Sequence, residues 1–234
     1  MPRLARDPLA GPPRILLNSS LPNSNLLETG QPRGSARLAG VLMHGRGRTA
    51  QEMIDLAHKL DLDGIRWVAP SAPTGSWYPH RFMRELDWNE PQLSGAIEAC
   101  DRAMEEVSEG GRIPPERRIV LGFSQGACVA TEYALRFPGK VAAIVVFTGC
   151  VMGPPDEDRD WKSVVGSLPN LKVLITGSDW DEWIDEEHTR ATAELFEELG
   201  AEVHLHIFNG RPHIVSDQEI EEARDLLKTL GSTG

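Results

Sequence analysis

The chain has 234 residues, of which 40% are hydrophobic and 25% are charged, with a formal net charge of −11 and three cysteines. This length fits one globular domain with a sizeable core, and the acidic balance argues against a nucleic-acid-binding protein, which normally presents a basic surface. The odd number and wide spacing of Cys100, Cys128 and Cys150 indicate free thiols rather than a disulfide framework.

The amino-terminal part differs in composition from the rest of the chain. Residues 1–37 are rich in Pro, Gly, Asn and Ser, which predicts an amino-terminal extension in which the ILL at 15–17 could form a short edge strand. Residues 38–234 are expected to form the main domain.

Apolar runs and amphipathic stretches alternate along this main domain. Strands are predicted over 38–43, 65–69, 118–123, 141–147, 171–176 and 203–208. Helices are predicted over 49–60, 92–109, 125–137, 186–199 and the segment that follows Ser216, and capping boxes start the first and the last of them, Thr49 with Glu52 and Ser216 with Glu219. The alternation predicts an α/β fold: a mostly parallel central sheet with helices on both faces. No insertion is long enough for a separate lid domain.

A nucleophile motif lies at one junction of strand and helix. Residues 122–126 (GFSQG) fit the pattern G-x-S-x-G, which alone is a weak signal, but here a predicted strand precedes it and a predicted helix follows. Such a turn is so sharp that side chains at Gly122 and Gly126 would collide with neighbouring elements. It lifts the hydroxyl of Ser124 clear of the sheet and directs the helix N-terminus at the reacting centre. We therefore predict that Ser124 is a nucleophile rather than an ordinary N-cap.

A serine nucleophile needs a base, and the base needs an acid. His213 is the candidate base because it lies in the loop directly after the last predicted strand. Residues 177–185 (GSDWDEWID) follow another strand and offer four acids, among which the residues alone do not decide: Asp179, Asp181, Glu182 and Asp185. The order serine, acid, histidine along the chain is that of α/β-hydrolases.

Acyl transfer also needs backbone N–H groups that stabilise the negative charge on the carbonyl oxygen. Gln125, the residue after the nucleophile, is expected to supply one of them. The Gly-rich turn 44–47 (HGRG) follows an early strand, and we assign the second donor to the N–H of Arg46. Neither a dinucleotide fingerprint nor a phosphate-binding loop is present, so we predict no cofactor and no metal.

Together these residues resemble the phospholipase/carboxylesterase family of α/β-hydrolases, which includes acyl-protein thioesterases and small bacterial carboxylesterases. The likeness covers residues 38–228, and its motifs are LMHGRG (42–47), WYP (77–79), NEP (89–91), GFSQGA (122–127), DEWI (181–184) and PHI (212–214). The resemblance implies Asp181 as the acid of the triad, with Asp179 as second choice. The chain departs from the family pattern at Trp183, Asp185 and Pro212, which leaves the triad intact and the substrate open.

Large apolar side chains accumulate in the loops at this end of the predicted sheet. The predicted pocket residues are Trp77, Tyr78, Phe82, Trp88, Trp183 and Ile214. A small hydrophobic cluster under long loops is an equally good interpretation of these aromatic residues. As a pocket, they would suit short- to medium-chain or aromatic acyl esters.

The predicted function is hydrolysis of small carboxylic esters through an acyl-enzyme, in the manner of a carboxylesterase or lysophospholipase. Thioester hydrolysis by the same triad and a non-catalytic binding protein on the same fold are the alternatives. The sequence has no signal-peptide core and no stretch of transmembrane length, so we predict a cytoplasmic protein without stable membrane insertion. The sequence is compatible with a homodimer and does not decide the oligomeric state.

Overall fold

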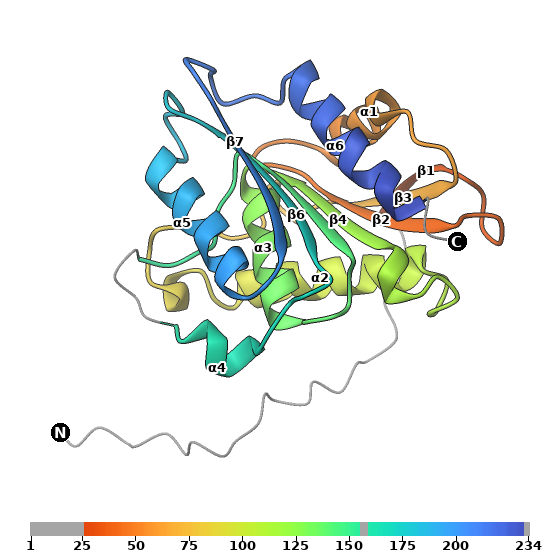
Figure 1. Cartoon of the computed structure of the whole chain (residues 1–234), viewed down its shortest axis with the longest axis horizontal. Helices are drawn as coiled ribbons and strands as arrows, with labels where there is room; N and C mark the ends of the chain where they lie inside the picture. The colour runs from red at the N-terminus through yellow and green to blue at the C-terminus, as the bar shows by residue number, and fades with distance from the viewer. Residues whose placement is uncertain (1–25, 155–158, 232–234) are drawn as a thin grey trace.

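The computed structural model describes residues 26–154 and 159–231, which form one seven-stranded sheet covered by helices (Figure 1). Six strands are parallel, and β1 pairs antiparallel with β3 at one edge of the sheet. The order across the sheet is β1-β3-β2-β4-β5-β6-β7. The strands are β1 (Leu26–Gly30), β2 (Leu38–Met43), β3 (Ile65–Pro70), β4 (Arg118–Phe123), β5 (Ala143–Phe147), β6 (Lys172–Ser178) and β7 (Glu202–Phe208).

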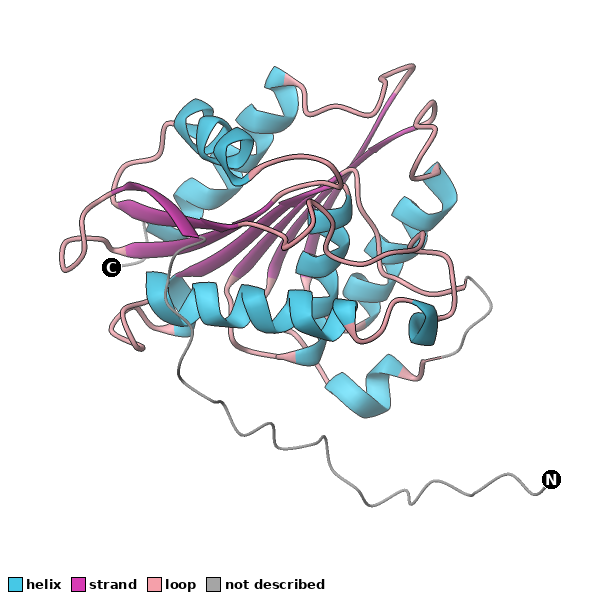
Figure 2. Cartoon of the chain, turned by 180° about the vertical axis from the view of Figure 1, so that it is seen from behind, coloured by secondary structure: helices cyan, strands magenta, loops and turns pink. Residues whose placement is uncertain are grey.

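Helices cover both faces of this sheet (Figure 2). One face carries α1 (Ala50–Leu60) and α6 (Asp217–Gly231), which pack against each other and against one cluster of buried side chains. The opposite face carries α2 (Gln92–Val107), α3 (Gln125–Arg136) and α5 (Glu186–Glu198), with the short α4 (Trp161–Val165) beside α3. The α/β fold with a mostly parallel sheet, predicted from the alternation of apolar runs, is therefore confirmed.

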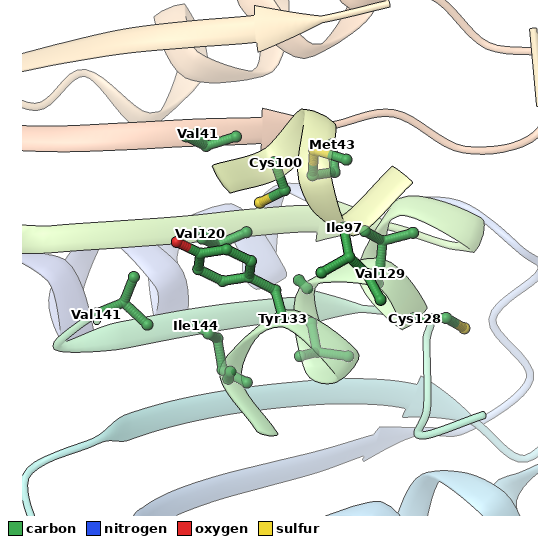
Figure 3. Close-up of a cluster of buried hydrophobic side chains, with 14 of the residues drawn as sticks. Val41, Met43, Ile97, Cys100, Val120, Cys128, Val129, Tyr133, Val141 and Ile144 are labelled. Carbon is green, nitrogen blue, oxygen red and sulfur yellow. The ribbon is translucent and has the colours of Figure 1, made fainter. Parts of the chain in front are cut away.

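The larger core lies between the sheet and α2 and α3. Figure 3 shows Tyr133 of α3 among Ile97 of α2 and the strand residues Val120 and Ile144. All four side chains are almost completely buried, and each contributes about 1.5–3 kcal/mol by leaving water. Because β4 and β5 are covered on both faces, their residues after Arg118 are apolar without alternation.

Both predicted capping boxes are present. Thr49 and Glu52 exchange bonds between side chain and backbone at the start of α1. At the start of α6 the backbone N–H of Ser216 donates to the Glu219 carboxylate, and the Glu219 N–H donates to the Ser216 hydroxyl at 3.3 Å. α5 ends just before Gly200, whose φ of +84° favours glycine. Local sequence therefore sets these helix ends.

One strand, one α-helix and two single-turn 3-10 helices, at Leu86–Trp88 and Pro115–Arg117, were not predicted. β1 lies within the predicted extension and has only partly buried or exposed residues, so no apolar run marks it. α4 has five residues, too few for a helical period to appear. The strand suggested at 15–17 lies outside the described residues, and the division of the chain at residue 37 remains a prediction. Every helix in the described ranges is too short or too polar to cross a bilayer.

Candidate active site

Ser124 occupies the sharp turn between β4 and α3, with φ 53° and ψ −118°. A non-glycine residue with such a positive φ stores strain of about 1–3 kcal/mol. The two flanking glycines are required. A Cβ added to Gly122 would lie 2.4 Å from the carbonyl oxygen of Gly126, and a Cβ added to Gly126 would lie 2.1 Å from the carbonyl oxygen of Met43. The Ser124 N–H donates to the carbonyl of Phe147 at 2.9 Å and ties the turn to β5. The local geometry is that of a nucleophile elbow.

His213 connects the serine to an acid. Its Nε2 lies 2.8 Å from Ser124 Oγ, and its Nδ1 lies 2.7 Å from Asp181 Oδ2. A carboxylate can only accept, so the proton on the imidazole belongs on Nδ1. The lone pair of Nε2 then faces the serine hydroxyl and is ready to accept its proton.

Asp181 is held as a carboxylate although its side chain is fully buried. Burial by itself raises the pKa of Asp181, but hydrogen bonds from His213 and from the backbone N–H groups of Ile184 and Trp183 outweigh it, so the pKa lies below its usual value. The two backbone bonds to Oδ1 measure 3.0 and 2.8 Å. One carboxylate oxygen is thus fixed by the loop, and the other faces the histidine.

The three other acids of this segment have different contacts. Asp179 accepts the N–H of Gly210 at 2.6 Å and so joins the acid loop to the loop that carries His213. Glu182 accepts from the indole of Trp183 at 3.2 Å. Asp185 caps α5. Asp181, the residue implied by the family resemblance, is therefore the acid that contacts His213, and Asp179 bonds to a backbone N–H instead.

The turn predicted to stabilise negative charge lies against the serine. An added Cβ at Gly45 would lie 3.3 Å from the Cβ of Ser124, so no side chain separates them. In the described part of the chain, the backbone N–H groups of Arg46 and Gln125 donate to no protein acceptor. Both remain available for a substrate oxygen, as the oxyanion-hole prediction requires.

Buried contacts brace this turn from behind. His44 donates from Nδ1 to the Gly45 carbonyl at 2.8 Å, and its Nε2 accepts the Ala72 N–H at 3.0 Å. Burial lowers the pKa of His44, so the ring stays neutral in this arrangement. The indole of Trp77 donates to the His44 carbonyl at 2.8 Å and packs on its ring. His44 thus fixes the shape of the turn 44–47.

The side chains of Arg46 and Gln125 also hold residues 76–80, which we call the aromatic loop. The Arg46 guanidinium donates to Ser76 Oγ and to the carbonyls of Pro79 and His80 at 2.9–3.1 Å. The Gln125 amide accepts from the Trp77 N–H at 2.9 Å and donates to the Tyr78 carbonyl at 2.7 Å. Sequence reasoning missed this role, because loop carbonyls leave no signal in a residue pattern.

A cavity of about 500 Å³ opens beside Ser124. Of the predicted pocket residues, Tyr78, Phe82 and Trp183 line it. The other three are not among its lining residues: Trp77 is 3% exposed and lies behind the turn 44–47, and Trp88 and Ile214 are 53% and 46% exposed. Sequence reasoning missed several lining side chains: Arg48, His80, Arg81, Phe123, Cys128, Glu182 and Ile184. Among the described residues, no three His, Cys, Asp or Glu side chains gather as metal ligands would.

The sequence matches the model of one protein family, described as phospholipase/carboxylesterase, over residues 25–231. The chain belongs to the phospholipase/carboxylesterase family. Acyl-protein thioesterase 1 of Eremothecium gossypii is 26% identical over an alignment 212 positions long, which covers 82% of this chain and 88% of the relative. The resemblance stated from the motifs is therefore confirmed.

Solved structures of this family and of other esterases share the fold. A phospholipase/carboxylesterase from Dyadobacter fermentans is 31% identical, with a TM-score of 0.80 over 87% of this chain and 96% of that chain. Esterase PE8, at 22% identity, has a TM-score of 0.74 over 88% of this chain and 98% of its own, and shows the likeness of the fold alone. Family membership makes this chain an ester hydrolase by class.

Proposed function

We propose that the chain is a serine hydrolase that cleaves small carboxylic esters through an acyl-enzyme. The observation that carries the proposal is the chain of two short hydrogen bonds from Asp181 through His213 to Ser124, of 2.7 and 2.8 Å. A serine hydroxyl is a poor nucleophile until a base removes its proton, and the imidazole lies within reach to do so.

The proposed reaction has two halves. Ser124 Oγ attacks the ester carbonyl while His213 Nε2 takes its proton, and Asp181 stabilises the imidazolium that forms. The N–H groups of Arg46 and Gln125 stabilise the negative charge on the carbonyl oxygen. His213 then protonates the leaving alcohol as the carbon–oxygen bond breaks. In the second half, His213 deprotonates a water that attacks the acyl-enzyme, and the acid leaves as Ser124 recovers its proton.

The cavity supports an acyl group of moderate size. Its volume of about 500 Å³ lies in the range of small-molecule sites, and Tyr78, Phe82, Phe123 and Ile184 give it apolar walls. We therefore propose short- to medium-chain or aromatic acyl esters as substrates. The cytoplasmic location and the homodimer stay predictions.

The test is hydrolysis of p-nitrophenyl esters from acetate to dodecanoate by wild type, Ser124→Ala and Ser167→Ala. Ser167 precedes β6, at the opposite end of the sheet, and serves as the matched control. We expect turnover and fluorophosphonate labelling by wild type and Ser167→Ala and neither by Ser124→Ala. Equal activity of the two serine variants would refute Ser124 as nucleophile. A wild type that neither labels nor turns over would favour a non-catalytic binding protein.

Thioester hydrolysis is a second candidate, favoured by the relatives named acyl-protein thioesterase 1. The same triad would attack a thioester carbonyl, with a thiol as the leaving group. Matched acyl groups presented as oxygen esters and as thioesters distinguish the two candidates through the ratio of their kcat/KM values. Loss of both activities in Ser124→Ala would assign them to one site.

A further inference from the structure

Arg211 lies two residues before His213, and only 7% of it is exposed. Its Nη1 donates to the carbonyl of Pro212 at 2.9 Å and also to the carbonyl of Ile214. These two carbonyls flank His213 on either side. One guanidinium therefore holds the backbone of the histidine loop closed around the residue that the proposed mechanism uses as its base.

A buried carboxylate forms an ion pair with this guanidinium. Glu219, in the first turn of α6, is completely buried. Its Oε2 lies 3.6 Å from Arg211 Nε and accepts the N–H and hydroxyl of Ser216 at 2.7 and 2.8 Å. Its Oε1 accepts the hydroxyl of Thr176 at 2.6 Å. The carboxylate thus binds both the end of the histidine loop and strand β6.

These contacts connect the loop of His213 to β6, the strand that precedes Asp181. Thr176 lies near the carboxyl end of β6, and the loop that leaves β6 carries Asp181. The path Thr176–Glu219–Arg211 therefore connects the strand that presents the acid to the loop that presents the histidine. Among the described residues, Nη1 is the only guanidinium nitrogen of Arg211 with hydrogen bonds, and buried Nε and Nη2 have none. The ion pair at 3.6 Å is therefore what compensates the buried charge of Arg211. Moving either group would leave a charge unpaired in a dry environment, so the pair has few alternative geometries.

We propose that the buried pair of Arg211 and Glu219 positions His213 for proton transfer from Ser124. Arg211 is a positioning residue, since its side chain is absent from the lining of the cavity and acts through the loop backbone. The inference rests on the proposed serine mechanism and adds to it a device outside the triad. It predicts that loss of the guanidinium slows the chemical step more than it weakens substrate binding.

The first test compares Arg211→Met with Arg66→Met. Arg66 is also a buried arginine with carboxylate partners, but it lies early in β3, away from the carboxyl ends of the strands. We expect Arg211→Met to lower kcat by about 10- to 100-fold, because small displacements of a catalytic group cost this much. KM should stay within about twofold, and the rate of fluorophosphonate labelling should fall with kcat. Arg66→Met should lose stability and keep its kcat.

The second test uses Glu219→Gln, which is expected to fold because an amide can still bond to Thr176 and Ser216. It removes only the charge beside Arg211, so we expect a smaller loss of kcat than in Arg211→Met. Arg211→Lys keeps the positive charge and should therefore retain a higher kcat than Arg211→Met. In the double variant Arg211→Met/Glu219→Gln, the loss should be less than the product of the single losses, because both act through one contact.

The outcomes separate this inference from the proposed function. If wild type is active, Ser124→Ala is inactive and folded Arg211→Met keeps the wild-type kcat, the positioning role is wrong and the serine mechanism stands. A raised KM at unchanged kcat, or losses that multiply in the double variant, would also overturn it. If wild type neither hydrolyses esters or thioesters nor labels, the proposed function fails and this inference fails with it.

Discussion

Replacing Asp181 by Asn changes one atom of the site and reverses the hydrogen bond to the histidine. Oδ1 of Asp181 accepts two backbone N–H groups, from Trp183 and Ile184. An asparagine must keep its oxygen at this position, because an amide NH₂ there would face two donors. Its NH₂ group then points at Nδ1 of His213, where the carboxylate Oδ2 now lies 2.7 Å away. Nδ1 must become an acceptor, and the ring proton moves to Nε2.

A proton on Nε2 removes the base. Nε2 lies 2.8 Å from Ser124 Oγ and would donate to the hydroxyl instead of accepting from it. Loss of the correct tautomer costs about a thousandfold to ten-thousandfold in kcat, which is about 4 to 5.5 kcal/mol in the barrier. Because the substitution is nearly isosteric and keeps both backbone bonds, the cavity and KM should change little.

The assay is kcat and KM for p-nitrophenyl butyrate, with Asp179→Asn as the matched control. Asp179 has the same side chain and bonds to the Gly210 N–H instead of the histidine. We expect Asp179→Asn to lose less than about tenfold in kcat, since an amide oxygen still accepts that bond. The reasoning is refuted if Asp181→Asn stays within tenfold of wild type, or if Asp179→Asn loses as much.

Three further predictions concern the elbow, the aromatic loop and pH. Gly126→Ala should lower the free energy of unfolding in urea by about 3 kcal/mol, because its Cβ would meet backbone atoms. The control Gly95→Ala in α2, with open space around it, should raise this free energy by about 0.5–1 kcal/mol. Equal effects of the two substitutions would contradict the steric argument. Gln125→Ala should cost about 1–3 kcal/mol by leaving loop groups unpaired and should raise KM, and an unchanged KM would exclude its role in shaping the pocket. Because the folded pKa of Asp181 is depressed, its contribution to stability is complete above about pH 4 and disappears at lower pH, so the stability difference between wild type and Asp181→Asn should shrink from pH 7 to pH 3.

Much of the fold was predictable because local rules decide it. The continuous apolar runs of β4 and β5 and the two capping boxes set their elements independently of distant residues. β1 was not predictable in this way, since its partly exposed residues follow no apolar pattern and only its pairing with β3 makes it a strand.

The parts of the site that depend on the order of elements along the chain were predictable. The parts that depend on the direction of loop side chains were not. Loops after parallel strands meet at one edge of the sheet, which brought the serine and histidine together. Within the loops no period fixes the direction of a side chain, so Trp77 and Trp183 looked equivalent. Trp77 nevertheless bonds to the carbonyl of His44 behind the turn 44–47, and Trp183 lines the cavity. Arg211 gave no signal either, because its acceptors are backbone carbonyls.

The position of β7 at the edge of the described sheet has a consequence for inactivation. His213 follows β7, which pairs with β6 alone in this sheet, whereas Ser124 follows the central β4. Edge elements open locally at lower free energy than the centre of a fold. Detachment of β7 and its loop would withdraw the base and leave the elbow and main core intact. Catalysis should therefore disappear at lower denaturant concentration than the tertiary signal of the core, and dilution should restore it quickly.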